Sequence, residues 1–393
     1  MVRGLSNFNG PVRSAHEAAT ATLLYNFQGG NSDGGYPYST LIGGPAGRLY
    51  GTTNGGGPSD DGTVFELKRT GPGYAERSLY AFQGGTDGEL PYGNLVLASN
   101  GTLYGTTYSG GAIGSGCIFA LTPSGNHYAE SVIYSFKGSP GDGGNPYAGL
   151  SVDASGTLYG TTLYGGTFGA GTVFSLKPTA SGYVETVLYS FSGASDGATP
   201  YGGVLPAGDG NLYGTSTYGG AEQDGVVYSL TPVNGGYAEN VLHNFTGGSD
   251  GAHPVGTLVE SKKGDVFGTT LDGGKGSAGT VFRVDTASKP YVESVLYAFT
   301  GGGDGGTPYG NLVLGDHDKL YGTTSSGGTG AGTVFELAKV RQGFAETVLA
   351  TFSGFPQEAT PYAGLFARDG ILYGTTFGGG FDGYGTVFSI SGH

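Results

Sequence analysis

The sequence Leu-Tyr-Gly-Thr-Thr recurs along this chain and restricts its fold more than any other feature. Seven copies, two of them slightly altered, begin at Leu49, Leu103, Leu158, Leu212, Val266, Leu320 and Leu372. Successive copies start 54, 55, 54, 54, 54 and 52 residues apart. Self-similarity at a fixed period is the signature of a repeat architecture, in which each repeat is one supersecondary unit that packs on its neighbours.

Each repeat contains four short runs that alternate in polarity and are separated by turn residues. In the third repeat these runs span residues 149–153, 157–162, 172–176 and 183–191. Glycine, proline and serine lie between them, the links are of hairpin length, and no run has a helical period. The repeat therefore predicts an antiparallel sheet of four strands.

The two ends of the repeat array predict how the seven sheets are arranged. The last repeat stops after its third strand, Thr386–Ile390, whereas Leu23–Phe27 has the pattern of a fourth strand with no repeat before it. Closing the ring with this strand would hide sheet edges that an open array leaves exposed. We therefore predict an all-β fold, a seven-bladed β-propeller over residues 20–393. Residues 1–19 form a separate segment outside the repeat.

Composition agrees with such a fold and disfavours several classes of partner. Glycine makes up 84 of 393 residues, while 28 Tyr and 21 Phe sit largely at fixed places in the repeat, as expected for short strands and tight turns. The net charge of −14 disfavours nucleic acid and anionic membrane surfaces as partners. No apolar run reaches the roughly 20 residues of a membrane span, so we expect no membrane insertion. We expect a monomer.

The repeat resembles the GloVer tandem repeats of choice-of-anchor proteins of bacteria. The resemblance spans residues 20–393 and rests on Leu-Tyr-Gly-Thr-Thr, the Gly-Gly that follows it, Gly171–Phe174, Tyr183–Phe191 and the linker Asp196–Gly202. It implies a protein that is secreted or held at the cell surface. It implies no activity that can be assigned to particular residues.

Two rings of residues are expected on one face of the propeller, formed by the linkers between repeats and the Gly-Gly loops. Tyrosines that follow the linker proline are Tyr38, Tyr92, Tyr147, Tyr201, Tyr309 and Tyr362, with Val255 as the exception. Aspartates five residues earlier are Asp33, Asp87, Asp142, Asp196, Asp250 and Asp304, with Gln357 at the seventh position.

Three interpretations of these rings remain open. The tyrosines, together with Tyr164 and Tyr218 of the Gly-Gly loops, are suited to stacking on sugars of a polysaccharide or cell-surface glycan. The aspartates are candidate ligands of Ca²⁺, the one cofactor that the sequence suggests. Alternatively, the aspartates cap their own turns and the tyrosines pack between blades.

The repeat departs most from its own pattern around the fifth blade. The candidate acid–base residues on neighbouring loops there are His253, Asp272, Lys275, Glu222 and Asp224. Val255 replaces the ring tyrosine beside them, which is expected to open space. Such a group could perform general acid–base chemistry, either β-elimination from a uronic-acid polysaccharide or glycoside hydrolysis. Ordinary variation of solvated loop residues is the alternative explanation.

Glutamates also recur, on the predicted outermost strand: Glu76, Glu130, Glu185, Glu239, Glu293 and Glu346. We expect their charge to discourage pairing between sheet edges of different molecules. Taken together, the sequence favours an extracellular binding or scaffold propeller that recognises carbohydrate on its loop face. A polysaccharide lyase or glycosidase acting at the loops of blades 4 and 5 is the alternative. A purely structural surface protein is a further one.

Overall fold

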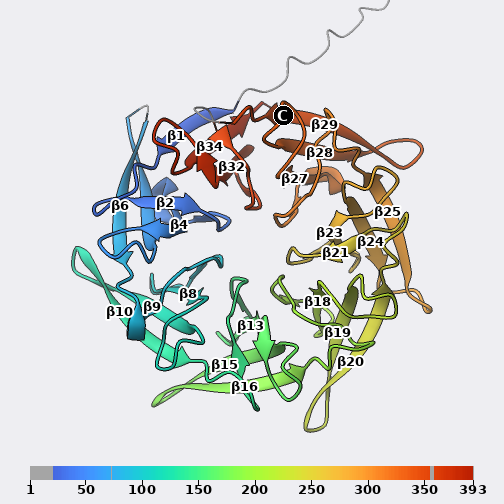
Figure 1. Cartoon of the computed structure of the whole chain (residues 1–393), viewed down its shortest axis with the longest axis horizontal. Coiled ribbons are helices and arrows are strands. Elements are labelled where there is room, and N and C mark those ends of the chain that lie inside the picture. The colour runs from blue at the N-terminus through green and yellow to red at the C-terminus, as the bar shows by residue number, and fades with distance from the viewer. Residues whose placement is uncertain (1–20, 72, 355–357, 393) are drawn as a thin grey trace, which may run out of the picture.

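The computed structural model describes residues 21–71, 73–354 and 358–392, which form seven antiparallel sheets arranged as a ring around a central axis (Figure 1). This confirms the predicted seven-bladed propeller. The N-terminal segment 1–19 and Gln357 lie outside the described residues. Within those residues there is no α-helix, only three short 3₁₀ turns at Pro45–Gly47, Gly85–Asp87 and Asp316–Asp318, and none is long enough to span a membrane.

Each blade has four strands that follow one another from the central axis to the rim (Figure 1). Blade 1 consists of β3 (Ile42–Gly43), β4 (Leu49–Gly56), β5 (Thr63–Thr70) and β6 (Gly73–Ala81), and blade 2 consists of β7 (Val96–Leu97), β8 (Leu103–Thr107), β9 (Cys117–Ser124) and β10 (His127–Ser135). Blade 3 consists of β12 (Ser151–Val152), β13 (Leu158–Thr162), β15 (Thr172–Thr179) and β16 (Gly182–Ser190). Blade 4 consists of β17 (Leu205–Pro206), β18 (Leu212–Ser216), β19 (Val226–Val233) and β20 (Gly236–Asn244).

Blade 5 consists of β22 (Val259–Glu260), β23 (Val266–Asp272), β24 (Thr280–Asp285) and β25 (Val292–Ala298). Blade 6 consists of β26 (Val313–Leu314), β27 (Leu320–Thr324), β28 (Thr333–Lys339) and β29 (Phe344–Thr351). Blade 7 consists of β31 (Phe366–Arg368), β32 (Ile371–Thr376), β34 (Thr386–Ser391) and β1 (Thr22–Asn26). Short strands in the linkers and Gly-Gly loops are β2 (Gly34–Pro37), β11 (Gly143–Gly144), β14 (Tyr164–Gly165), β21 (Ala252–Pro254), β30 (Glu358–Ala359) and β33 (Gly378–Gly379).

The N-terminal strand closes the ring. Strand β1 pairs antiparallel with β34, so that the seventh sheet has the order β1-β34-β32-β31. The register places Leu23 opposite Phe388 and Asn26 opposite Thr386. The prediction that the N-terminal strand completes the last sheet is thereby confirmed.

The recurring Leu-Tyr-Gly-Thr-Thr forms the second strand of each blade, and its glycine has a steric role. Gly160 lies opposite Phe174 in the sheet, and a Cβ at Gly160 would lie 2.5 Å from the Phe174 ring. Because glycine has no side chain to fill this space, the Phe174 ring can occupy it and contact Phe136 of the preceding blade, with 5.1 Å between ring centroids. Seven hydrophobic clusters of this kind, each shared by two adjacent blades, form the core.

The two threonines of the motif connect different parts of the molecule. The Thr161 hydroxyl donates to the Gly202 carbonyl of the next blade at 2.9 Å, whereas the Thr162 hydroxyl bonds to Thr172 of the third strand at 2.8 Å. The first threonine therefore ties blades together, and the second ties strands together. Equivalent bonds between blades are made by Thr52, Thr106, Thr215, Thr323 and Thr375.

Candidate functional site

The residue before the linker proline is held in a left-handed conformation in every blade. At His253 the φ angle is +55°, and the equivalent residues Tyr36, Leu90, Asn145, Thr199, Thr307 and Thr360 have φ between 51° and 60°. The backbone N–H of His253 donates to the Asp224 carbonyl at 2.9 Å, which fixes the linker to the preceding Gly-Gly loop. Such a conformation is costly for a residue other than glycine, so the surrounding structure must impose it. The linker thus presents one variable side chain per blade on a fixed backbone.

In blade 5 this side chain is an imidazole between two carboxylates. The Nδ1 atom of His253 lies 3.0 Å from an Asp272 oxygen, and its Nε2 atom lies 4.0 Å from an Asp224 oxygen. The Tyr218 ring meets the imidazole edge to face, with 5.2 Å between centroids. The structure therefore brings together His253, Asp272 and Asp224 of the five predicted acid–base residues. Lys275 and Glu222 are exposed, and neither makes an ion pair within the described part of the chain.

The ring tyrosines pack on one another across the central channel. The Tyr38 ring lies 5.2 to 5.8 Å from the rings of Tyr92, Tyr147, Tyr309 and Tyr362. Burial, followed by the neighbouring hydroxyls of Tyr147 and Tyr309, raises the pKa of Tyr38 above its usual value. The faces of these rings are thus largely used for mutual packing.

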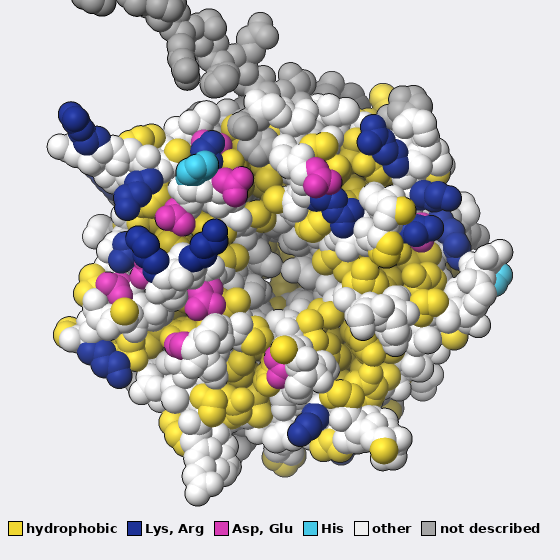
Figure 2. Space-filling view, turned by 180° about the vertical axis from the view of Figure 1, so that it is seen from behind, with side chains coloured by type: hydrophobic (Ala, Val, Ile, Leu, Met, Phe, Trp, Pro, Cys, Tyr) yellow, Lys and Arg dark blue, Asp and Glu magenta, His cyan; other side chains and the backbone are white. Residues whose placement is uncertain are grey.

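The channel keeps a cavity of about 60 Å³ lined by the ring tyrosines and by Val255. From behind, the same centre is visible as a hollow lined by hydrophobic side chains (Figure 2). Binding sites for small molecules are typically about 300–1,000 Å³, so this cavity does not accommodate a sugar ring. Val255 is itself buried, and the absent tyrosine leaves no open subsite there.

Aromatic surface that is free to meet a ligand lies beside the channel, on the loops of blades 3 and 4. Tyr164 is 48% exposed and Tyr218 is 47% exposed. Burial raises the pKa of Tyr201 to about 12, assisted by the nearby hydroxyls of Tyr309, Tyr164 and Tyr218. The linker that carries Tyr201 is bonded to both loops, because Ala198 pairs with Tyr218 and the Thr199 N–H donates to the Ala170 carbonyl. We call Tyr164, Tyr201, Tyr218, His253 and Asp272 the loop-face arc.

The linker aspartates serve their own turns. Asp142 accepts from the backbone N–H groups of Lys137 and Gly143 at 2.8 and 2.7 Å, and from the Tyr134 hydroxyl at 2.8 Å. No group of three or more His, Cys, Asp or Glu that could hold a metal ion occurs in residues 21–71, 73–354 and 358–392. The geometry therefore agrees with the turn-capping interpretation, and it offers calcium no assembled set of ligands.

Each linker aspartate acts electrostatically on a glutamate of the following blade, and at one junction the tyrosine that donates to the aspartate also reaches this glutamate. The Tyr134 hydroxyl lies 3.4 Å from a Glu185 oxygen, and Asp142 acts electrostatically on the same glutamate. We call this set a junction triad. Its members are Tyr25, Asp33 and Glu76; Tyr80, Asp87 and Glu130; Tyr134, Asp142 and Glu185; Tyr189, Asp196 and Glu239; His243, Asp250 and Glu293; and Tyr297, Asp304 and Glu346.

The triads correct the expected role of the recurring glutamates. These side chains face the preceding blade instead of solvent, and one carboxyl oxygen of each is buried without a hydrogen-bond partner. Burial, and secondly the linker aspartate, raise the pKa to about 8 at Glu76 and to about 7 at Glu185. Carboxyls that lie between two blades are not displayed at a free sheet edge and cannot repel a foreign edge by charge, so that expectation was wrong.

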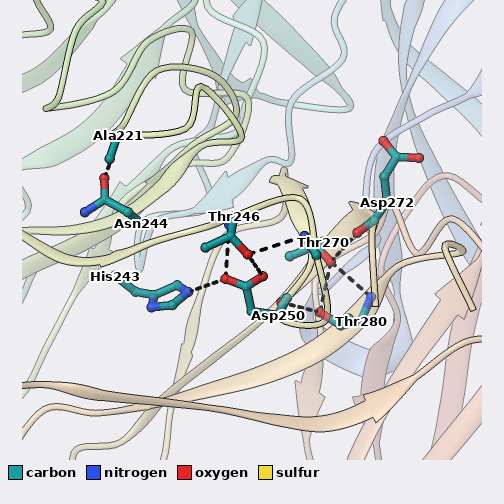
Figure 3. Close-up of polar contacts among 9 residues, drawn as sticks. Ala221, His243, Asn244, Thr246, Asp250, Thr270, Asp272 and Thr280 are labelled. Carbon is teal, nitrogen blue, oxygen red and sulfur yellow. Dashed lines mark hydrogen bonds and ion pairs between the residues drawn. The ribbon is translucent and has the colours of Figure 1, made fainter. Parts of the chain in front are cut away.

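His243 belongs to a junction triad, and Figure 3 shows its imidazole directed at Asp250. Its Nε2 atom lies 3.1 Å from Asp250, which also accepts from the backbone N–H and the hydroxyl of Thr246. Burial lowers the pKa of His243, although Asp250 opposes this effect. The imidazole thus replaces the tyrosine hydroxyl of the other triads.

Sequence reasoning missed the triads, although a signal was present. At one junction all three members are replaced together, by Ala350, Gln357 and Ala21. Ala21 packs there against a buried apolar cluster that includes Ala350. Joint replacement of three residues by apolar or neutral ones indicates that they act as a unit.

Comparison with solved structures shows the fold alone. The chain is similar to the extracellular domain of a one-component system from B. thetaiotaomicron, with TM-score 0.59 and 10% identity over 96% of this chain and 40% of that chain. It thus spans well under half the length of that protein. A protein described as a 6-phosphogluconolactonase from Bacteroides fragilis has TM-score 0.54 and 15% identity over 86% of this chain and 99% of its own. A similarly described protein from Bacteroides uniformis has TM-score 0.54 and 13% identity, with 83% and 88% covered.

Comparison with sequences identifies the family. No curated protein matches this chain. The family described as the Gloeobacter/Verrucomicrobia repeat matches residues 1–207 and 180–388, which together span nearly the whole sequence. This agrees with the resemblance to GloVer repeats, and the chain therefore belongs to the Gloeobacter/Verrucomicrobia repeat family.

Proposed function

We propose that this propeller is an extracellular carbohydrate-binding protein whose loop-face arc recognises a polysaccharide or cell-surface glycan. The observation that carries the proposal is the two half-exposed rings, Tyr164 and Tyr218, on the loops of adjacent blades, where the Tyr218 ring contacts His253 and His253 pairs with Asp272. Aromatic faces stack on the apolar faces of sugars, while carboxylate and imidazole groups bind hydroxyls. An extracellular location is supported by the repeat family and by the structural likeness to an extracellular domain.

A glycan array with matched variants tests this proposal. Because Tyr164 and Tyr218 are half exposed, replacing both by alanine should leave the fold intact and weaken glycan binding at least about tenfold. Phe381→Ala is the control, since Phe381 is an aromatic residue 76% exposed on the loops of blade 7. That variant should bind as the wild type does. Equal binding by the double tyrosine variant and the wild type would refute the proposal.

A second candidate function, polysaccharide lyase or glycosidase activity, is favoured by the position of His253 between two carboxylates. Asp272 can accept the Nδ1 proton of His253 and so leave Nε2 as a base. In β-elimination this base would remove the proton next to a uronate carboxylate while the glycosidic C–O bond breaks. The departing oxygen would then take up a proton from water.

Incubation with a panel of plant and bacterial polysaccharides separates the two functions. Lyase activity would appear as unsaturated-uronate absorbance and hydrolysis as new reducing ends, and His253→Ala should abolish either signal. A pure binding protein gives neither signal, whether or not His253 is replaced. Absence of product from every substrate would exclude the enzymatic candidate.

A further inference from the structure

A second hollow lies between blades 3 and 4, away from the loop face. It is lined by the β12–β13 turn and by the hairpin of β15 and β16, which lie at the strand ends opposite to the linkers and Gly-Gly loops. Its volume is about 500 Å³, within the range of roughly 300–1,000 Å³ typical of sites for small molecules. We call it the blade 3/4 groove.

Comparison with other blades of the same chain shows why this groove is open. Two positions on the second and third strands hold an oppositely charged pair in blades 1, 5 and 6. The pairs are Arg48 with Glu66 at 2.7 Å, Asp265 with Arg283 at 3.4 Å, and Lys319 with Glu336 at 2.9 Å.

In blade 3 the same two positions hold Thr157 and Ser175. The equivalent hollow of blade 1, which Arg48 and Glu66 line, measures about 230 Å³. Short hydroxyl side chains therefore leave in blade 3 the space that long charged side chains occupy in blades 1, 5 and 6.

The walls of the groove carry hydroxyl groups and two aromatic rings. Thr157 of the β12–β13 turn, Ser175 of β15 and Thr186 of β16 supply hydroxyls, and the rings of Tyr159 and Tyr237 belong to two adjacent blades. Hydroxyls both donate and accept hydrogen bonds. This combination matches a ligand that is itself covered with hydroxyls and has flat apolar faces.

One carboxylate at the groove is held ionised by its own turn. Asp153 accepts from the backbone N–H groups of Ser155 and Thr157 and from the Ser155 hydroxyl on Oδ1, and from the Tyr159 hydroxyl on Oδ2 at 3.0 Å. Partial burial acts to raise the pKa of Asp153, but these hydrogen bonds outweigh it and lower the pKa. With one of its two acceptor positions used, Oδ2 retains capacity for a further donor. Lys177 also lines the groove, so its positive charge offsets that of Asp153. A lining with one charge of each sign and several hydroxyls suits a neutral polyol better than a strongly charged ligand.

We propose that the blade 3/4 groove is a binding site for a neutral sugar of one or two rings, separate from the loop-face arc. Tyr159 and Tyr237 supply the aromatic walls, Asp153 binds a sugar hydroxyl through Oδ2, and Thr157, Ser175 and Thr186 complete the polar lining. This site does not depend on the loop-face proposal, because the two share no residue.

The test uses maltose, cellobiose and xylobiose as probes in isothermal titration calorimetry with the full chain. Thr157→Arg with Ser175→Glu fills the groove with the pair that blade 1 already carries. Thr186→Arg, which copies the exposed Arg77 at the equivalent position of blade 1, is a second filling variant that changes no buried residue. Both should weaken the binding of at least one disaccharide by about tenfold or more.

Two controls separate the groove from other sites. Arg48→Thr with Glu66→Ser converts blade 1 to the residues of blade 3 and should not reduce binding. Tyr164→Ala with Tyr218→Ala removes the aromatic rings of the loop-face arc and should leave disaccharide binding unchanged. Failure of all three disaccharides to bind the wild type, or equal binding by a folded filling variant, would overturn the proposal. Loss of binding only in the tyrosine variant would place the sugar on the loop face and overturn it too.

Discussion

Tyr228 occupies in blade 4 the position at which the third strand of every other blade has phenylalanine, at Phe65, Phe119, Phe174, Phe282, Phe335 and Phe388. Its ring packs as theirs do, 5.1 Å from Phe191. Its hydroxyl, however, is buried and has no hydrogen-bond partner. A buried polar group without a partner costs about 1–3 kcal/mol of stability.

Tyr228→Phe should therefore stabilise the protein, by about 1 kcal/mol, because it removes the unpaired hydroxyl and restores the residue of the other blades. Urea denaturation followed by circular dichroism measures the change in the free energy of unfolding. Tyr213→Phe is the control, since the Tyr213 hydroxyl donates to Asp209 at 2.7 Å and its loss should give no gain. A Tyr228→Phe variant no more stable than the wild type would contradict this account of the hydroxyl.

At the residue scale, the sequence predicted part of the loop-face arc. His253, Asp272 and Asp224 depart from the repeat pattern at positions that face one another across two loops. Counting residues along the repeat therefore showed that they lie on neighbouring loops. Lys275 and Glu222 stand on the same loops, but exposed side chains on loops take directions that repeat spacing does not determine. The packing of Tyr38 against four other tyrosines was open in the sequence, because a ring of equivalent positions does not tell whether the side chains meet.

At the element scale, the outer strands join neighbouring blades through the junction triads. A glutamate with a pKa raised from 4.5 in the unfolded chain to about 7 or 8 in the folded protein binds its proton more tightly when folded. Its contribution to stability is complete below about pH 4.5 and is lost as the pH rises through 7 to 8. Six such groups should make the ring less stable in mildly alkaline solution.

The melting temperature should therefore fall between pH 6 and pH 9 at constant ionic strength, as measured by differential scanning calorimetry. Glu185→Gln combined with Glu239→Gln should reduce this fall by about one third, because two of the six groups no longer titrate. Glu222→Gln, which removes an exposed carboxylate, should leave the slope unchanged. A melting temperature independent of pH over this range, or an unaltered slope in the double variant, would contradict the assigned role of the glutamates.

The positions of the strands were easier to predict than which face of each strand is buried. Alternation and turn residues predicted all four strands of a blade, because each is a local pattern. The glutamates were misjudged because an outermost strand still has one face against its neighbour. Glu185 lies two residues from Tyr183 and from Val187, both partly buried, so the alternation itself indicated the inner face.

At the scale of the whole molecule, the ring separates two surfaces. Linkers and Gly-Gly loops form one face, where the loop-face arc adjoins a channel that tyrosines fill. From behind, Lys and Arg side chains are spread over the outer part of the disc (Figure 2). The closed ring was predictable because the last repeat lacks a fourth strand, and the N-terminal strand has the pattern of a fourth strand with no repeat before it. The blade 3/4 groove was not, because the size of a groove depends on how side chains from two adjacent blades pack and not on the repeat pattern.

Hydrogen–deuterium exchange in the presence of the glycan that binds most tightly on the array tests the central claim most directly. The loop-face arc predicts slower exchange in residues 163–166, 198–203, 217–224 and 252–255, with unchanged exchange in the hairpin of β15 and β16. The Tyr164→Ala, Tyr218→Ala variant should lose this protection at the same glycan concentration. Protection confined to the hairpin, or no protection of the four loop segments at saturating glycan, would contradict the account.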